Sequence, residues 1–473
     1  MLAPAVAAGL VVAVSGGVGA SVAEPGSPGT MAAPRLVLYE GFENAPPTTA
    51  TFVQTIDDYP DSAAPTVPGY VGATGQTYDA DPGWNGEFCD GLIVTAQDPT
   101  PHPDVPQAAD CSGAGWSDSL DLAETLGLWA ADPDYPYPGL VGRDPLTNHV
   151  VTAYTEGDPP PGVMVSTSVA ATPGHFYSAS IDVAQANCWT ENPVDLSVAI
   201  SDGSGAAAEV FAGPIAACDL PVHQLNGDNV GTFVGRQGVL IAGDDLTLAV
   251  RNELGGGGGN DNAIDNLALI DITPQLDVTI APPPSGDAYP AGSAARLTFT
   301  VTNTYLAGFP AVPSGPKPGF SFSASLPARL VAAADPRAST DCDSAAVNAA
   351  GPTVSVTASL LGTDVACTVS LDVTSSTSGT YVLDPAAVTT FGVLAPSAAS
   401  VTFAAVPAPP APPAGGGGSR TGTPGGLAAT GSDPAAAVFA ATLIALAGMA
   451  TLALRGGSGR REMRRSPSEP RLR

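Results

Sequence analysis

The C-terminal half of the chain contains runs in which apolar and polar residues alternate. In residues 297–302 three apolar residues alternate with threonine, and residues 367–374 repeat the alternation. A period of two is typical of a strand that buries one face, so both runs are predicted to be strands. A last strand pair is predicted to begin at Gly379 and to end near Phe403.

The first half of the chain is less regular. One helix is predicted at residues 119–131, because Leu122, Leu126 and Trp129 fall on one helical face. Elsewhere, short apolar runs are interrupted by Pro, Gly, Asp and Asn, which is typical of β-sandwich modules. Strands are predicted at residues 176–183, 194–200 and 246–250. The predicted fold class is therefore mainly β.

A different pattern closes the chain. Residues 435–454 contain no charged residue and no proline. A helix of that length spans about 30 Å, which is the thickness of the hydrocarbon core of a bilayer. Residues 455–473 contain seven arginines against two glutamates. Because positive residues beside a span stay in the cytoplasm, we predict a transmembrane helix with the preceding chain outside the cell.

Just before this predicted span lies the pentapeptide Leu427-Ala428-Ala429-Thr430-Gly431. Pentapeptide, apolar stretch and basic tail together resemble the sorting signal of sortase-anchored, LPxTG-like surface proteins of Gram-positive bacteria. The second residue matches the LAxTG variant of actinobacteria. The resemblance implies that a sortase cleaves after Thr430 and joins it to peptidoglycan. The alternative is a single-pass membrane protein with its ectodomain outside.

The N-terminus predicts export. Residues 1–23 are small and apolar and end in Ser21-Val22-Ala23, an acceptable cleavage site of a signal peptide. The secretion machinery and a signal peptidase are therefore expected partners, and the C-terminal helix would hold the chain in the membrane before processing. Composition divides the rest into two modules and a Pro/Gly-rich linker, at residues 35–273, 274–404 and 405–426.

Charge narrows the set of partners. Residues 24–430 carry 42 of the 45 acidic residues and 9 of the 16 basic residues, which leaves them a net charge of −33. Nucleic acid and other polyanions are therefore not expected as partners, because nothing would offset the repulsion.

Six cysteines in an exported chain are expected to form disulfides. Pairing of nearest neighbours would close loops of about 20–30 residues, each worth roughly 3 kcal/mol in the loop-entropy description. The predicted pairs are Cys89 with Cys111, Cys188 with Cys218, and Cys342 with Cys367.

Both modules resemble known families. The second resembles a bacterial Ig-like repeat of cell-surface proteins, of the DUF11 type, on residues 297–303, 325–327, 342, 367–370 and 378–381. This resemblance implies an Ig-like β-sandwich that serves as a spacer or stalk. The first module begins with residues 38–44 and ends with residues 259–267. These ends resemble the first and last strands of the galactose-binding-like jelly rolls found in carbohydrate-binding modules.

The second resemblance implies a metal site. In such jelly rolls an acidic residue of the first strand and an aspartate of the last strand often share a structural Ca²⁺, an ion that prefers oxygen ligands. The ligands here would be Glu43 and Asp265, with Glu40 and Asp261 nearby. The alternative is that these four residues are solvated turn residues of an acidic protein.

The chain contains no Gly-x-Ser-x-Gly, His-Glu-x-x-His, P-loop or Rossmann motif. We therefore expect a non-enzymatic surface protein that binds an extracellular glycan or protein. Trp84, Trp116, Trp129 and Trp189 are candidates for stacking on sugars, although tryptophans more often pack in a core. Two alternatives stay open: a wall-attached glycoside hydrolase with its carboxylate pair in residues 35–273, and a coat protein without a specific ligand.

Overall fold

A computed structural model of the chain describes residues 27–407, except for 60–75, 82–83, 85–88, 109–110, 112, 134, 137–143, 155–161, 189–193, 204–206, 220–222 and 254–259. The predicted signal peptide, the pentapeptide at 427–431, the apolar stretch at 435–454 and most of the linker lie outside the described residues. Within the described part, no helix is long and apolar enough to cross a membrane.

The first module is built from two antiparallel sheets. The larger contains β1 (Arg35–Glu40), β2 (Gln54–Thr55), β4 (Asp90–Val94), β5 (Val150–Ala153), β8 (His175–Gln185), β11 (His223–Leu225), β12 (Asp228–Val234), β13 (Val239–Ile241) and β15 (Asn262–Asp271). Its order is β11-β12-β8-β15-β5-β4-β2, with β13 paired to β8 and β1 paired to β15. The long strands β8 and β15 therefore lie at its centre.

The smaller sheet contains β3 (Tyr78–Ala80), β6 (Gly162–Ser166), β7 (Val169–Ala170), β9 (Leu196–Ser201), β10 (Ala208–Glu209) and β14 (Asp245–Asn252). Its order is β10-β9-β14-β6-β3, with β7 paired to β14. Three of the strands predicted from the sequence correspond to β8, β9 and β14, so these predictions are confirmed.

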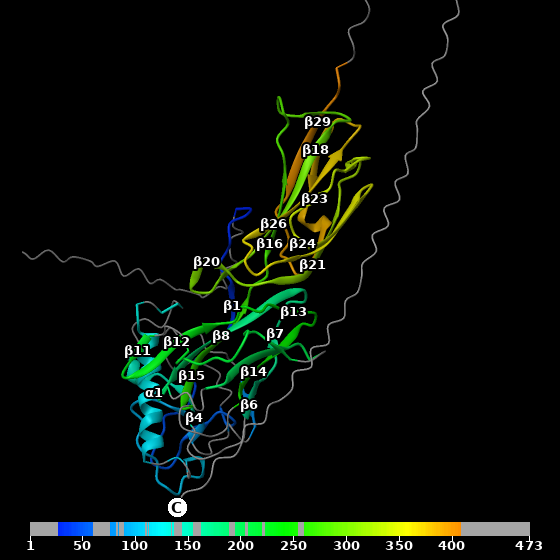
Figure 1. The fold of residues 1–473 in the computed structure, drawn as a ribbon. Helices are drawn as coiled ribbons and strands as arrows, with labels where there is room; N and C mark the ends of the chain where they lie inside the picture. The colour runs from blue at the N-terminus through cyan, green and yellow to red at the C-terminus, as the bar shows by residue number, and fades with distance from the viewer. Residues whose placement is uncertain are drawn as a thin grey trace, which may run out of the picture. The chain divides into compact units, whose positions relative to one another are not determined.

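The larger sheet is covered on both faces. Ile181 and Val183 of β8 join the core between the two sheets, whereas Ala184 packs with Leu122 and Leu126 of helix α1 (Ala114–Ala130). Figure 1 shows α1 lying along this sheet beside β11, β12 and β15. The helix predicted at 119–131 is therefore confirmed, and it begins five residues earlier. Short 3-10 helices, η3 (Pro106–Ala108) and η4 (Pro145–Thr147), flank it in the sequence.

The second module is also mainly β. It contains β16 (Gln275–Ile280), β17 (Tyr289–Pro290), β18 (Ala294–Thr302), β19 (Tyr305–Leu306), β20 (Phe309–Pro313), β21 (Lys317–Ser325), β22 (Val331–Ala332), β23 (Ser339–Thr340), β24 (Asp343–Ala350), β25 (Thr353–Leu360), β26 (Ala366–Thr374), β27 (Gly379–Leu383), η5 (Pro385–Ala387), β28 (Val388–Phe391) and β29 (Ala399–Ala404). Two sheets, β16-β18-β26-β22 and β24-β25-β21-β28, contribute most of its core.

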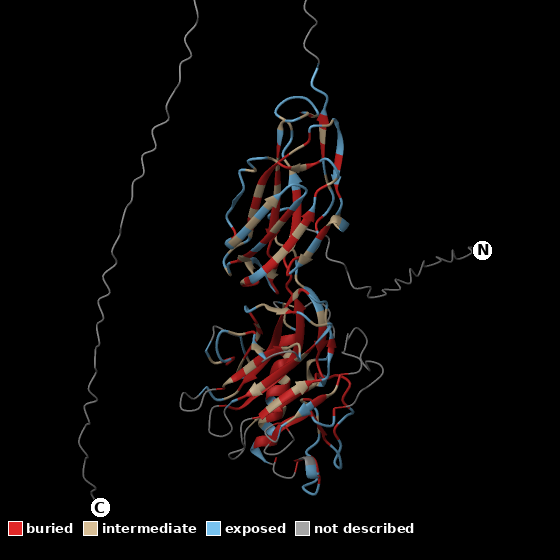
Figure 2. Ribbon diagram, turned by 90° about the vertical axis from the view of Figure 1, so that its right-hand side faces the viewer, coloured by how far each residue is buried: buried red, intermediate tan, exposed pale blue. Residues whose placement is uncertain are grey.

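The alternation in the sequence explains this core. Leu297, Phe299 and Val301 of β18 are all buried, and β26 presents Val369 opposite Phe299. Figure 2 shows buried and exposed residues alternating along many strands of this module. The predicted strands at 297–302 and 367–374 are confirmed as β18 and β26, and the predicted last pair as β27 and β29.

All three predicted disulfides are present. Cys89 is bonded to Cys111, Cys188 to Cys218 and Cys342 to Cys367. The first two lie within the first module and the third within the second. The cross-links therefore strengthen each module separately.

Candidate functional site: a buried carboxylate network

The two predicted calcium ligands lie at neighbouring strands. Glu43 follows β1, Asp265 lies in β15, and these strands pair antiparallel with Glu40 opposite Leu267. The side chains are nevertheless inaccessible, since Glu43 is 1% exposed and Asp265 is 0% exposed. Glu40 and Asp261 are also buried. The alternative that these are solvated turn residues is therefore wrong.

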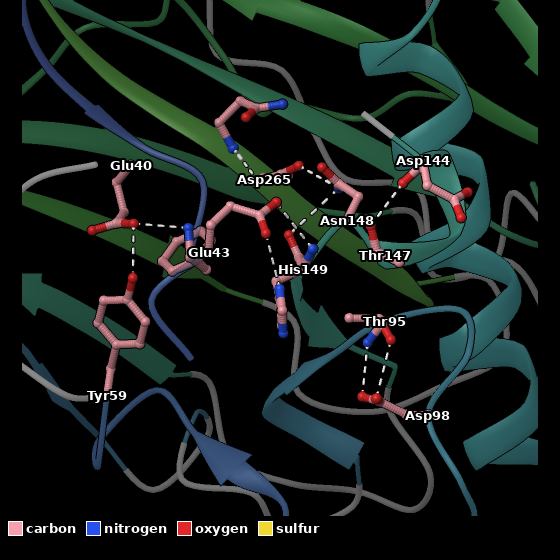
Figure 3. A network of polar contacts seen from close by, with 12 residues as sticks. Glu40, Glu43, Tyr59, Thr95, Asp98, Asp144, Thr147, Asn148, His149 and Asp265 are labelled. Carbon is pink, nitrogen blue, oxygen red and sulfur yellow. Dashed lines mark hydrogen bonds and ion pairs between the residues drawn. The ribbon is translucent and has the colours of Figure 1, made fainter. Parts of the chain in front are cut away.

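Each of the two carboxylates is bound by one residue of the segment between η4 and β5. Asn148 donates from Nδ2 to Asp265 Oδ2 at 2.8 Å. His149 donates from its backbone N to Glu43 Oε1 at 3.3 Å, and its Nδ1 lies 3.0 Å from Glu43 Oε2. Figure 3 shows these four side chains converging on one another. Two successive residues thus connect the acidic groups of β1 and β15.

A third buried carboxylate lies directly across from Asp265. Asp182 of β8 is its register partner. The Asp182 carboxylate accepts hydrogen bonds from Thr232 Oγ1 at 2.5 Å, Asn266 Nδ2 at 2.7 Å and Tyr135 OH at 2.9 Å. Burial raises the pKa of Asp182 to about 7, although the three hydrogen bonds oppose that rise. All three of these donors to the Asp182 carboxylate are neutral groups.

Asn266 connects this aspartate to the rest of the network. It sits at a register shift of β15 with a φ of 52°, a left-handed conformation that asparagine tolerates better than most residues. Its Oδ1 accepts from Tyr39 OH at 2.5 Å while its Nδ2 donates to Asp182. Its backbone N donates to Asp265 Oδ1 at 2.6 Å. One residue thus contacts three members of the network.

Glu40 forms a separate polar group at the end of β1. Its Oε1 accepts from the backbone N of Phe42 at 2.7 Å and from Tyr59 OH at 3.0 Å. Burial raises the pKa of Tyr59 and of Tyr78, and the negative charge of Glu40 raises both further. These phenols therefore stay protonated and can act as donors.

The donors around Glu43 and Asp265 fit calcium poorly. Each of the four carboxylate oxygens has an N–H group of Asn148, His149 or Asn266 at hydrogen-bond distance. A cation would face the positive ends of these N–H dipoles instead of further oxygen ligands. In the described part of the chain, no group of three or more His, Cys, Asp or Glu side chains could hold a metal ion. The groups around Glu43 and Asp265 therefore do not fit a bound calcium ion.

The structure also describes three of the four tryptophans that are candidates for stacking on sugars. Trp84, Trp116 and Trp129 are each at most 4% exposed, so these three are core residues, as is more common for tryptophan, and they are not available to stack on sugars. Trp129 in addition donates from Nε1 to Thr232 Oγ1 at 3.0 Å, next to Asp182. Trp189 lies outside the described residues.

Sequence reasoning missed Asp182, Asn148 and His149. One signal was available for Asp182, because it is the single charged residue in the predicted strand 176–183. Asn148 and His149 carry no such signal. They approach the acidic pair only because the chain from α1 returns to the sheet at β5.

Comparisons with known proteins match part of the chain. Residues 280–404 match the model of a domain of unknown function, DUF7933. This match covers most of the second module, whose sequence resembles a DUF11-type repeat. A search of curated proteins finds no significant match.

Several solved structures are distantly similar. The N-terminal domain of the Streptococcus gordonii adhesin Sgo0707 matches at 9% identity and a TM-score of 0.25, over 52% of this chain and 61% of that chain. The C-terminal domain of the Streptococcus agalactiae AgI/II polypeptide BspA matches at 9% identity and a TM-score of 0.20, over 51% and 93%. A CBM27 module of Caldicellulosiruptor saccharolyticus, solved with mannohexaose, matches at 12% identity and a TM-score of 0.18, over 27% and 77%. Scores this low carry no argument about function.

Proposed function

We propose that this protein is exported and attached to the cell wall, where its two β-modules are displayed for adhesion or for binding an extracellular glycan or protein. The observation that carries the proposal is the order of segments after the second module. A Pro/Gly-rich linker, the pentapeptide Leu427–Gly431, the apolar residues 435–454 and an arginine-rich tail follow one another there. This order is what a sortase requires of its substrate.

The disulfides support the extracellular part of the proposal. The described residues contain three disulfides and no free cysteine. Such bonds persist in oxidising surroundings and are rare in the cytosol. A linker rich in proline is extended and stiff, so it would hold the modules away from the wall.

The buried network favours a binding protein over the glycoside hydrolase alternative. A glycosidase needs two carboxyl groups that reach the scissile bond of a sugar. Glu43, Asp182 and Asp265, which the fold gathers in residues 35–273, are each at most 1% exposed. They are bound by protein donors, so their arrangement serves the fold.

The anchoring is tested on the producing cells. Their walls would be digested with a muralytic enzyme, and the C-terminal peptide would be identified by mass spectrometry. We expect a peptide that ends at Thr430 and carries a peptidoglycan fragment. Recovery of the chain only in the membrane fraction, with residues 435–473 intact, would make it a single-pass membrane protein instead.

Binding is tested separately on the released protein. A glycan array and a panel of extracellular matrix proteins would be probed, and reducing-sugar release would be measured with the same glycans. Binding without turnover supports the proposal. Sugar release that is abolished by one carboxylate substitution would establish the hydrolase, and the absence of both would favour a coat protein.

A further inference from the structure

We propose that Asn148 and His149 take the place of a metal ion in the first module, holding Glu43 of the β1 end and Asp265 of β15 together without calcium. Two acidic side chains buried side by side need a compensating positive partner, because an isolated buried charge is strongly destabilising. In this protein the dipeptide Asn148-His149 supplies hydrogen-bond donors to both carboxylates, through contacts of 2.8 to 3.3 Å, and Asn266 adds a donor to Asp265.

Backbone amides make the arrangement hard to convert into a metal site. Glu43 Oε1 accepts from the backbone N of His149, and Asp265 Oδ1 accepts from the backbone N of Asn266. A side-chain donor can rotate away when a cation arrives, whereas these N–H groups are fixed by the chain. One oxygen of each carboxylate is therefore permanently directed at a donor.

The imidazole supplies the remaining contact of Glu43. A carboxylate accepts hydrogen bonds only, so His149 Nδ1 carries the proton shared with Glu43 Oε2. His149 is about one-sixth exposed while Glu43 is buried. An N–H group of the partly exposed imidazole thus lies 3.0 Å from Glu43 Oε2, where it would compete with a cation for that oxygen.

Asn148 and His149 are positioned by the 3-10 helix η4, which directly precedes them and packs on α1. Asp144 caps η4 by accepting from Leu146 N at 3.1 Å. The turn rests on Gly127 of α1, where an added Cβ would lie 2.0 Å from the carbonyl oxygen of Pro145. The helix therefore requires glycine at this point so that η4 can pack closely enough to deliver Asn148 and His149.

Metal content and thermal unfolding of the purified protein test the proposal. After dialysis against metal-free buffer, we expect less than stoichiometric calcium by elemental analysis. We also expect the same Tm in millimolar EDTA and in millimolar Ca²⁺. One tightly bound calcium per chain, or a Tm lowered by EDTA, would overturn the proposal, because a ligand specific for the folded state must raise the Tm.

Substitutions of His149 distinguish its hydrogen bond to Glu43 from simple packing of the imidazole ring. His149→Ala should lower the Tm by about 5 °C, as expected for one lost buried polar contact. In His149→Asn the Nδ2 of asparagine can occupy the position of the histidine Nδ1. This variant should therefore have a Tm close to that of the wild type. The matched control is His102→Ala, which removes the 3.1 Å contact of Nδ1 with Asp104 Oδ2 between two exposed side chains. Equal Tm values for the three variants would overturn the proposal.

A charge-creating variant provides the converse test. Asn148→Asp replaces the donor to Asp265 by a third carboxylate and leaves the backbone donors in place. We expect this variant to unfold at a lower temperature than the wild type in EDTA, and by the same amount in Ca²⁺, because the backbone donors still oppose a cation. A variant as stable as the wild type in EDTA would show that Asp265 needs no donor there, and the proposal would fail.

Discussion

The two modules contain buried aspartates that are compensated in different ways. In the first, Asp182 accepts from the neutral donors Thr232, Asn266 and Tyr135, although Asp271 of the same module pairs with Arg35. The second pairs its buried Asp372 with two arginines, Arg296 at 3.1 Å and Arg337. Sheets of the same class therefore tolerate acidic residues either by hydrogen bonding or by ion pairing. The choice depends on which side chains the neighbouring strands supply.

The second module also buries an amine. Lys317 is the only lysine of the chain and is 0% exposed. Its Nζ donates to Ser314 Oγ at 3.0 Å and to Gly315 O at 2.9 Å. Burial lowers the pKa of this amine to about 7. The first module thus contains an acid that resists ionisation, and the second a base that resists protonation.

The largest expected effect comes from the residue that joins the acidic network. Asn266→Ala removes the donor to Asp182 and the acceptor for Tyr39, and it places alanine at a φ of 52°. We expect a loss of about 3–5 kcal/mol in the free energy of unfolding. The control is Asn226→Ala, because Asn226 has a φ of 50° in an exposed hairpin turn. Denaturant unfolding measures both, and similar losses would show that backbone strain alone explains the effect.

Removal of the disulfide in the second module should cause the next largest loss in the free energy of unfolding. The Cys342–Cys367 bond closes a loop with a sequence separation of 25. Replacing both cysteines by serine should lower the free energy of unfolding of the second module by roughly 3 kcal/mol in the loop-entropy description. Hydrogen exchange resolved by peptide should show faster exchange in β18 and β26 and little change in β8 and β15. Equal loss of protection in both modules would refute the separation of the cross-links.

Asp182 should make the first module less stable as the pH rises from about 4 to 7. Its folded-state pKa is raised from 3.8 to about 7, so the folded protein keeps a proton that the unfolded chain releases. The stabilisation is fully present below pH 3.8 and is lost as the pH rises through 7. Its size is on the order of 3 kcal/mol. Asp182→Asn should flatten this part of the stability profile, and an unchanged slope would contradict the assignment.

Lys317 should affect the pH dependence of stability with the opposite sign to Asp182, and in a higher pH range. Its folded-state pKa of about 7 lies below the usual 10.5, so the unfolded chain binds a proton that the folded protein lacks. Stability should therefore rise between pH 7 and 10, by on the order of 3 kcal/mol. In Lys317→Met this rise should vanish, and the variant should be more stable than the wild type at pH 7. Ser314 Oγ keeps its contacts with Asn303 and Thr304 in that variant.

The smallest effect is expected at an exposed arginine. The Arg337 side chain is 68% exposed while its partner Asp372 is 3% exposed. Arg337→Ala should lower the free energy of unfolding by about 1 kcal/mol or less, because Arg296 still binds the aspartate. Arg296→Ala should have the larger effect, since it also loses hydrogen bonds to Arg337 O and Ser339 Oγ. Chemical denaturation at low salt would rank the two variants.

Much of the fold was predictable because strand formation follows the pattern of side chains along the chain. The alternation at 297–302 required one face of β18 to be buried, and its partner β26 carries the same alternation. Neighbouring cysteines paired as expected because short loops cost least entropy to close. Prediction was weaker for α1, whose first turn contains Ala114 and Gly115 and carries no clear periodicity.

The candidate site was predictable only in part. The two ends of the first module resemble the first and last strands of galactose-binding-like jelly rolls. This resemblance predicted that Glu43 and Asp265 lie near each other, as they do in the structure (Figure 3). It did not predict what would lie between them. The resemblance implied calcium as the partner, and it gave no indication that Asn148 and His149 would contact the two carboxylates. No local pattern in the sequence distinguishes these donors from other loop residues.

The sequence by itself determined the properties that depend on residue order and composition. These are the strands of the modules and the disulfide partners. Export and wall attachment stay predictions from the two ends of the chain. Tertiary structure alone decided which polar groups are buried and what neutralises them. Asp182 and Asp265 are 83 positions apart in the sequence, and they become neighbours only when β8 and β15 pair. Burial and hydrogen bonding are properties of such long-range contacts, so a linear pattern cannot reveal them.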